Sequence, residues 1–179
     1  MAKKTPSPEP QQLVKLTVVV DTPIIGRYMS PTDEGKEEDL KQLVECYKLL
    51  GYGEETLKKV VHADRWFFRD RECNAFIPGN VLSGALRKAL NDKSIEVDGA
   101  LIIKADEVKK VITLLADSVE AGGEKSMTVY EAIRVGARLE SLVRINKDLS
   151  QIKQPIIAYI GARREKGFGR VEIYIQPIK

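Results

Sequence analysis

Residues 161–170 read GARREKGFGR and lie between an apolar run, IIAYI at 156–160, and a final segment rich in Val, Ile and Tyr. This Gly-rich loop holds three glycines, four cations and one aromatic residue. Glycine permits positive φ, and successive main-chain N–H groups in such a loop can form an anion-binding concavity. Such a concavity and the four cations suit the phosphate backbone of a nucleic acid. Phe168 offers a face on which a base could stack. The competing interpretation is a solvated turn before an edge strand.

Composition sets wide bounds on the remaining chain. A length of 179 residues suits one domain, or one domain with an insertion, and 43% hydrophobic residues supply a core. The net charge of +3 permits nucleic acid without requiring it. Cations dominate the Gly-rich loop, whereas acids dominate residues 32–39, so local charge is more informative than the total.

The two cysteines, Cys46 and Cys73, lie 27 positions apart without a partner motif, so we expect reduced thiols in an intracellular protein. Together with the single His62 they are too few for a zinc site. No apolar run approaches a membrane span, and the N-terminus lacks a signal-peptide core. These features predict a cytoplasmic protein with no membrane contact. Since no nucleotide-binding or hydrolase motif is found, we expect no metal and no organic cofactor.

The first third of the chain predicts a tail, a strand and two helices. Residues 1–12 are polar with three prolines and predict a flexible tail, and the β-branched residues 13–21 predict a strand. Helical spacing of apolar residues predicts helices at 38–50 and 54–61, which we interpret as an insertion spanning about 36–61. The aromatic run RWFFR at 65–69 predicts an extended segment that packs in a core or interface.

Residues 76–90 predict a turn followed by an amphipathic helix with Asn80 as its N-cap. Gly84 inside this helix costs up to about 1 kcal/mol relative to alanine, which suggests that a backbone approaches closely there. That backbone would belong either to a ligand or to a tightly packed sheet.

The remaining elements complete an α+β order. We predict a strand at 97–104, a helix at 106–116, a Gly-containing loop at 117–127, a strand at 138–145, a short connector or helical turn at 148–154 and a last strand at 170–176. Without the insertion, the order is strand, helix, strand, strand, short helix, strand. This βαββαβ order predicts a single ferredoxin-like or RRM-like domain over residues 13–179. Fold alone assigns no function.

Three segments resemble a known family. IPGNVLSGALR at 77–87 resembles the IPGSSLKGALR segment of the CRISPR-associated RAMP superfamily, and the Gly-rich loop resembles that family's GFG signature before the final strand. YEAIRVGARL at 130–139 resembles the lead into a middle strand of its backbone subunits. Ser83 departs from the pattern, which commonly has lysine there. The chain also shows no clear β-hairpin thumb, although residues 106–127 occupy a possible place for one.

This resemblance implies an RNA-binding subunit of a CRISPR effector complex, most like a type III backbone subunit. Its implied partners are guide RNA (crRNA), possibly target RNA, other effector subunits and further copies along the RNA. The residues that we predict to contact RNA are Arg27, Ser83, Arg87, Lys88, Gly161, Arg163, Arg164, Lys166, Gly167, Phe168, Gly169 and Arg170. Any one of these cations considered alone is better explained by a surface ion pair, for example with Glu165 or Glu172, than by RNA contact.

Two other functions stay open. The first is an endoribonuclease, metal-assisted or metal-independent, because some type III backbone subunits cut RNA with an aspartate in the loop after the first strand, where Asp33 lies. Asp33 sits in an acidic stretch that fits a solvated loop better. His62 is a candidate general base, though a lone histidine is more often structural. The second is a RAMP-like scaffold or inhibitor that does not contact RNA.

Overall fold

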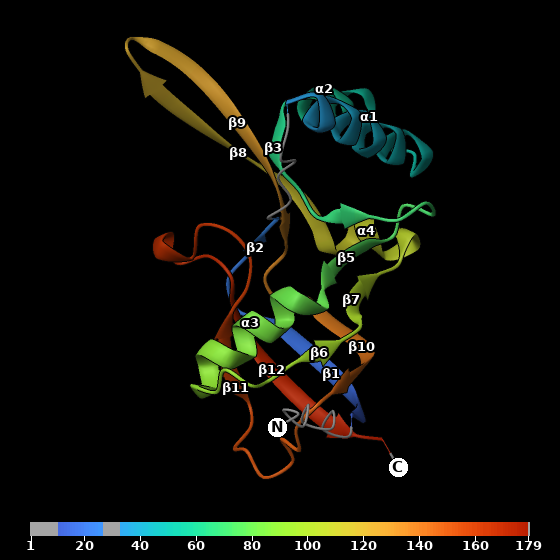
Figure 1. Cartoon of the computed structure of the whole chain (residues 1–179). Coiled ribbons are helices and arrows are strands. Elements are labelled where there is room, and N and C mark those ends of the chain that lie inside the picture. Colours follow the sequence, from blue (N-terminus) through green and yellow to red (C-terminus); the bar gives the residue numbers. More distant parts are fainter. Residues whose placement is uncertain (1–10, 27–32, 179) are drawn as a thin grey trace, which may run out of the picture.

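The computed structural model describes residues 11–26 and 33–178, with side chains except at 33, 117–121 and 125–127 (Figure 1). It is a mixed α+β structure. Its elements in chain order are β1 (Gln12–Val20), β2 (Ile24–Ile25), α1 (Asp33–Leu49), α2 (Glu54–Val60), β3 (Ala63–Arg65), β4 (Phe68–Arg69), β5 (Ala75–Pro78), α3 (Gly79–Leu90), β6 (Val97–Asp98), β7 (Ala100–Ile103), α4 (Ala105–Val111), β8 (Ile112–Ala121), β9 (Glu124–Ile133), β10 (Arg138–Ile145), β11 (Ile156–Tyr159), a 3-10 turn (Arg164–Lys166) and β12 (Arg170–Pro177).

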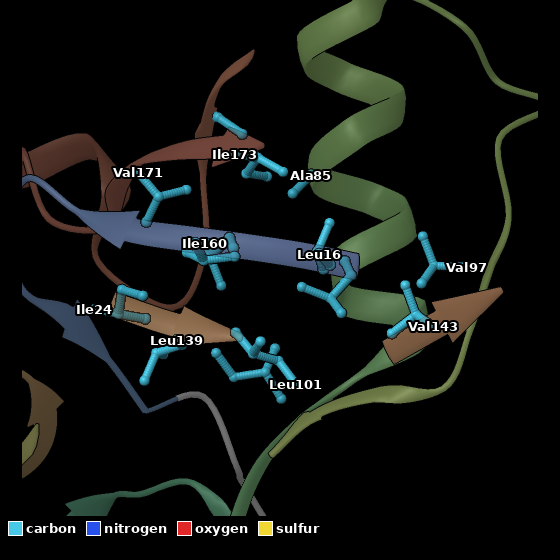
Figure 2. Packing of buried hydrophobic residues seen from close by; sticks show 14 of the residues in the cluster. Leu16, Ile24, Ala85, Val97, Leu101, Leu139, Val143, Ile160, Val171 and Ile173 are labelled. Atoms are coloured by element: carbon cyan, nitrogen blue, oxygen red, sulfur yellow. The ribbon is translucent and has the colours of Figure 1, made fainter. Parts of the chain in front are cut away.

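The largest sheet has five antiparallel strands in the order β11-β12-β1-β10-β6. β1 lies between β12 and β10 because its alternate residues Val14, Leu16, Val18 and Val20 are buried against the core. Helix α3 covers this buried face, and Figure 2 shows its side chains meeting those of the sheet. The smaller sheet β4-β5-β7 adjoins the start of α3, because β5 leads directly into that helix.

The second sheet, β2-β9-β3 with β8 paired to β9, contains a long hairpin that projects from the molecule in Figure 1. β8 and β9 pair from Ile112 opposite Ile133 to Ala121 opposite Glu124. Gly122 and Gly123 form the turn, both with positive φ, as a two-residue hairpin turn requires. The predictions of a helix at 106–116 and a loop at 117–127 are therefore wrong after Val111. A short apolar run fits either period, and pairing with β9 decides for strand.

The helical pair, α1 and α2, agrees with the two helices expected at 38–50 and 54–61, but α1 begins earlier, at Asp33. The polar residues 33–37 lack apolar periodicity, so the sequence pattern did not include them. The pair packs through a separate apolar cluster of Leu43, Tyr47, Val60, Ala63 and Trp66.

Cys46 and Cys73 form a disulfide, with their Cα atoms 5.5 Å apart. The prediction of two reduced, unpaired thiols is therefore wrong. A separation of 27 positions says nothing about distance in space, and here the packing of α1 against the loop between β4 and β5 brings the two residues together.

Smaller differences concern element ends. The strand expected at 97–104 is divided into β6 and β7 around Gly99, which has a φ of 121°. Helix α3 begins at Gly79 with Pro78 as N-cap, so Asn80 lies inside the helix. Residues 148–154 form a connector of turns and bends, one of the two forms expected for this segment. In the described residues no helix is long and apolar enough to cross a membrane.

Candidate nucleic-acid interface

The Gly-rich loop is held at its base and turns sharply at its tip. At the base, the Ala162 N–H donates to the Ile25 carbonyl at 3.2 Å and the Gly169 N–H donates to the Pro23 carbonyl at 2.9 Å. At the tip, the 3-10 turn is flanked by two left-handed residues, Arg163 with φ 58° and Gly167 with φ 88°. The loop is therefore anchored to the segment around β2.

The glycines of this loop have different physical roles. A Cβ at Gly169 would lie 2.0 Å from the Ile160 carbonyl oxygen, and one at Gly161 would lie 2.5 Å from the Ile25 carbonyl oxygen. These two positions are glycine because the protein's own backbone approaches them. A Cβ at Gly167 would meet nothing within 4 Å, so only its positive φ favours glycine there.

Three residues predicted to contact RNA make contacts within the protein. The Arg170 guanidinium pairs with the Asp21 carboxylate. The Arg163 guanidinium lies over the Tyr130 ring, 4.8 Å from its centroid, a cation–π contact. Phe168 is partly buried against the cluster that contains Tyr130 and Ala162. Their interactions shape the loop from within.

Arg164 and Lys166 are the loop's remaining cations. Arg164 is partly exposed and Lys166 is exposed, and neither forms an ion pair with another described residue. They are consequently the two loop cations best placed for a phosphate.

The predicted site residues of α3 also separate by role. Ser83 is 3% exposed, and its hydroxyl donates to the Gly79 carbonyl and accepts from the Val97 N–H, both at 2.8 Å. It therefore ties α3 to β6. The Arg87 Nε donates to the Ile95 carbonyl at 2.6 Å, whereas Lys88 is exposed. Arg27 lies outside the described residues.

A groove of about 480 Å³ separates the first turns of α3 from the start of the Gly-rich loop. It is lined by Phe68, Pro78, Asn80, Val81, Gly84, Ala85, Tyr159, Ile160, Gly161 and Arg164. Pro78, Asn80 and Val81 line the groove, so the first turn of α3 and the positive end of its helix dipole lie beside it. The N-cap residue Pro78 makes no side-chain capping hydrogen bond to the first-turn N–H groups.

Gly84 keeps this groove open. A Cβ at Gly84 would meet nothing within 4 Å, so the expected close approach of the sheet to this glycine is wrong. Because Gly84 lines the groove, a side chain at this exposed position would begin at its wall with room for a Cβ. The alternative expectation, that a ligand backbone approaches Gly84, stays a prediction.

Two aromatic residues line the groove: Phe68, from the aromatic run expected to pack in a core or interface, and Tyr159, which the sequence pattern did not single out. Tyr159 is 43% exposed, and the Phe68 ring stacks on Phe76 with centroids 5.5 Å apart. Alternation in the 156–160 run would have marked Tyr159, since Ile156 and Ala158 are the buried positions of β11. Aromatic faces beside a cation suit the bases and phosphates of a single strand.

A buried carboxylate, which sequence reasoning also missed, joins the helical pair to β9. Glu131 is 0% exposed and accepts from the Tyr47 hydroxyl at 2.6 Å, the Phe67 N–H at 3.0 Å and the Arg69 guanidinium at 2.5 Å. Burial and the Glu131 charge raise the pKa of Tyr47, which keeps its hydroxyl protonated as a donor. Burial alone would lower the pKa of Arg69, but the adjacent carboxylate outweighs it and raises that pKa.

The two candidate catalytic residues lie apart from the groove lining. Asp33 is the first residue of α1, and His62 is an exposed residue after α2. Neither lines the groove. Among the side chains that the structure describes, no three from His, Cys, Asp or Glu are grouped in a way that could hold a metal ion.

The comparisons with known proteins found a similarity of fold only. No protein-family model matches the sequence, and no curated protein matches it. Among solved structures, a chain of the Type III-B Cmr-beta bound to cognate target RNA, determined by cryo-EM, is similar with a TM-score of 0.53. The two chains are 13% identical, and the match covers 94% of this chain and 61% of that one. At this identity the similarity concerns the fold alone, and the chain spans about 61% of the length of that chain.

Proposed function

We propose that this chain is an RNA-binding subunit of a CRISPR effector ribonucleoprotein and that it holds guide RNA in the groove between α3 and the Gly-rich loop. The observation that carries the proposal is the groove itself, with an uncapped helix N-terminus on one side and Arg164 on the other. Fold similarity to a chain of an RNA-bound Type III-B complex supports it.

The strand order also supports the proposal. With β11 set aside, β12-β1-β10-β6 is the strand order expected for a ferredoxin-like sheet, with α3 in the place of its first helix; between β10 and β12, which the structure describes throughout, there is a 3-10 turn and no second α-helix. The groove lies beside the start of that helix. A single strand would place phosphates near Arg164, Lys166 and the α3 N-terminus, and unstacked bases against Tyr159 or Phe68.

Blocking the groove tests the proposal directly. Gly84→Gln adds a side chain at a lining position of the groove, where the Cβ meets no atom within 4 Å, while Ala89→Gln adds the same side chain at another exposed position of α3 that does not line it. We expect Gly84→Gln to weaken single-stranded RNA binding about tenfold, the effect of losing one stacked base. Ala89→Gln should bind like the natural chain. Equal affinities for the two variants would place RNA elsewhere.

The charge contribution is tested by salt dependence. Replacing Arg164 and Lys166 with alanine should reduce the slope of log affinity against log salt by about 0.7 for each phosphate of a single strand that the variant no longer neutralises. Lys153→Ala, an exposed lysine that does not line the groove, is the matched control and should leave the slope unchanged. An unchanged slope in the double variant would contradict the phosphate-binding role assigned to Arg164 and Lys166.

The other two functions predict different outcomes. An endoribonuclease would lose RNA cleavage on Asp33→Ala or His62→Ala while RNA still bound. A scaffold would join a heteromeric assembly without RNA affinity at the groove, and the intramolecular contacts of Arg163, Phe168 and Arg170 are the observation that favours it. RNA binding that depends on Gly84 supports the guide-binding function over the scaffold.

A further inference from the structure

Strand β9 contacts the helical pair through one residue and the Gly-rich loop through the next. Glu131 accepts the hydrogen bond of Tyr47 from α1, whereas Tyr130 contacts Arg163 and clusters with Ala132 and Ala162. Successive side chains of a strand point to opposite faces, so β9 presents one face to each region. A displacement of β9 would therefore alter its contacts with the helical pair and with the Gly-rich loop.

The disulfide lies at the junction between α1 and the segment that carries Arg69. Cys46 precedes Tyr47 in α1, and Cys73 follows β4, which ends at Arg69. Cys46 is 2% exposed and Cys73 is 6% exposed. The covalent bond and the Tyr47–Glu131–Arg69 contacts therefore fasten the same two segments to each other.

We propose that the Cys46–Cys73 disulfide is a redox-responsive latch: when oxidised it fixes α1 against Glu131 of β9, and when reduced it releases α1 and loosens the Gly-rich loop. Its effect on RNA affinity rests on the function proposed above. Its effect on the motion of the loop does not.

The chemistry needs an external dithiol. One thiolate of the dithiol attacks one sulfur of the disulfide, which breaks the protein S–S bond, releases the other cysteine as a thiolate and leaves a mixed disulfide; the second thiol of the reagent then closes its own disulfide and releases the attacked cysteine. Two electrons and two protons pass to Cys46 and Cys73, which become thiols, and the dithiol becomes a disulfide. Because both sulfurs are buried, attack follows a local opening of α1, and reclosure is then no longer enforced covalently.

The release of α1 on reduction would change the mobility of the Gly-rich loop through β9. Without the latch, α1 opens more often, and each opening removes the Tyr47 hydroxyl from Glu131 and lets water reach the Glu131–Arg69 pair. β9 then loses part of what defines its position. Tyr130, and with it the left-handed Arg163 that rests on its ring, becomes less fixed.

Hydrogen exchange on the full chain with and without a dithiol tests the latch. The disulfide should first be verified by alkylation under denaturing, non-reducing conditions, which should modify neither cysteine. On reduction, amides of α1, of 129–132 and of 161–167 should exchange at least about fivefold faster, the lower end of couplings between sites. Amides of β1 should stay protected on the timescale at which those of 161–167 exchange, because the five-stranded sheet lies outside the latch and opens only by global unfolding.

The double variant Cys46→Ser, Cys73→Ser is the matched control. It should exchange like the reduced natural chain and should not respond to the dithiol. Alkylation of both cysteines without reductant would overturn the proposal, as would unchanged exchange at 161–167 on reduction. RNA affinity, measured in parallel, should fall about fivefold on reduction. If exchange responds but RNA binds in neither state, the latch stands and the RNA-binding function fails.

Discussion

The Gly-rich loop and the buried group of Glu131, Tyr47 and Arg69, here called the Glu131 cluster, use charge in opposite ways. The loop keeps Arg164 and Lys166 at the surface without a carboxylate partner among the described residues, in a region open to solvent. The cluster buries Glu131 and Arg69 completely or nearly so and pairs them. Exposed cations remain available to an external anion, whereas a buried pair stabilises one packing arrangement and becomes costly when one partner is lost.

This comparison separates binding from assembly. Substitutions of the exposed loop cations Arg164 and Lys166 should change RNA affinity and leave stability nearly intact. Substitutions in the cluster should change stability first. The two regions can therefore be told apart by which property a substitution changes.

Glu131→Gln should have the largest effect. It leaves the Arg69 guanidinium buried without a counter-charge, so the free energy of unfolding should fall by about 3–5 kcal/mol. Denaturant unfolding measures this. Glu140→Gln, which removes exposed ion pairs with Lys15 and Arg138, should cost only about 0–1 kcal/mol. Similar costs for the two variants would contradict the role given to the cluster.

Reduction of the disulfide should come next. Opening a bond between residues 27 positions apart should lower the free energy of unfolding by about 3–4 kcal/mol on the chain-entropy account. Unfolding of the natural chain with and without a dithiol measures it, and the double serine variant should show no dependence on the dithiol.

The loop glycines should differ from each other. Gly167→Ala should cost about 1–2 kcal/mol, the strain of a left-handed alanine, because its side chain meets open space. Gly169→Ala should cost more, since its Cβ would also strike the Ile160 carbonyl and displace the start of β12. Thermal or denaturant unfolding of the pair decides this, and a larger cost at Gly167 would be inconsistent with the structure.

Alkaline pH should weaken the cluster. The pKa of Tyr47 is raised above its usual 10.0 by burial and by Glu131, so the folded chain keeps a proton that the unfolded chain releases. The free energy of unfolding should therefore fall by about 1.4 kcal/mol per pH unit above pH 10 from this group. Tyr47→Phe should lose that part of the slope. The comparison of the two pH profiles, rather than either alone, isolates Tyr47 from other tyrosines.

Gly84→Ala should have the smallest effect and the opposite sign. Alanine is the better helix former and its Cβ meets no atom, so α3 and the chain should be stabilised by up to about 1 kcal/mol. A destabilised variant would mean that a backbone packs against this glycine after all.

Local patterns predicted what depends on neighbours in sequence. Alternation predicted β1 and β12 nearly to their ends, and helical spacing predicted α2 and α3. The same patterns misassigned residues 112–127, because a short apolar run fits a helix or a strand until its partner strand is known. They also marked Gly84 and Gly161 but could not say whether the space beside each held a backbone or solvent.

The sequence by itself determined an α+β chain with a basic, glycine-rich turn before its last strand, because residue spacing and backbone freedom are local properties. Only the tertiary structure decided that Arg164 lines a groove while Arg170 pairs with Asp21, and that Cys46 meets Cys73. It alone made Glu131 a buried anchor. Burial and pairing depend on which distant segments pack together, and that is fixed by the whole fold rather than by any one stretch.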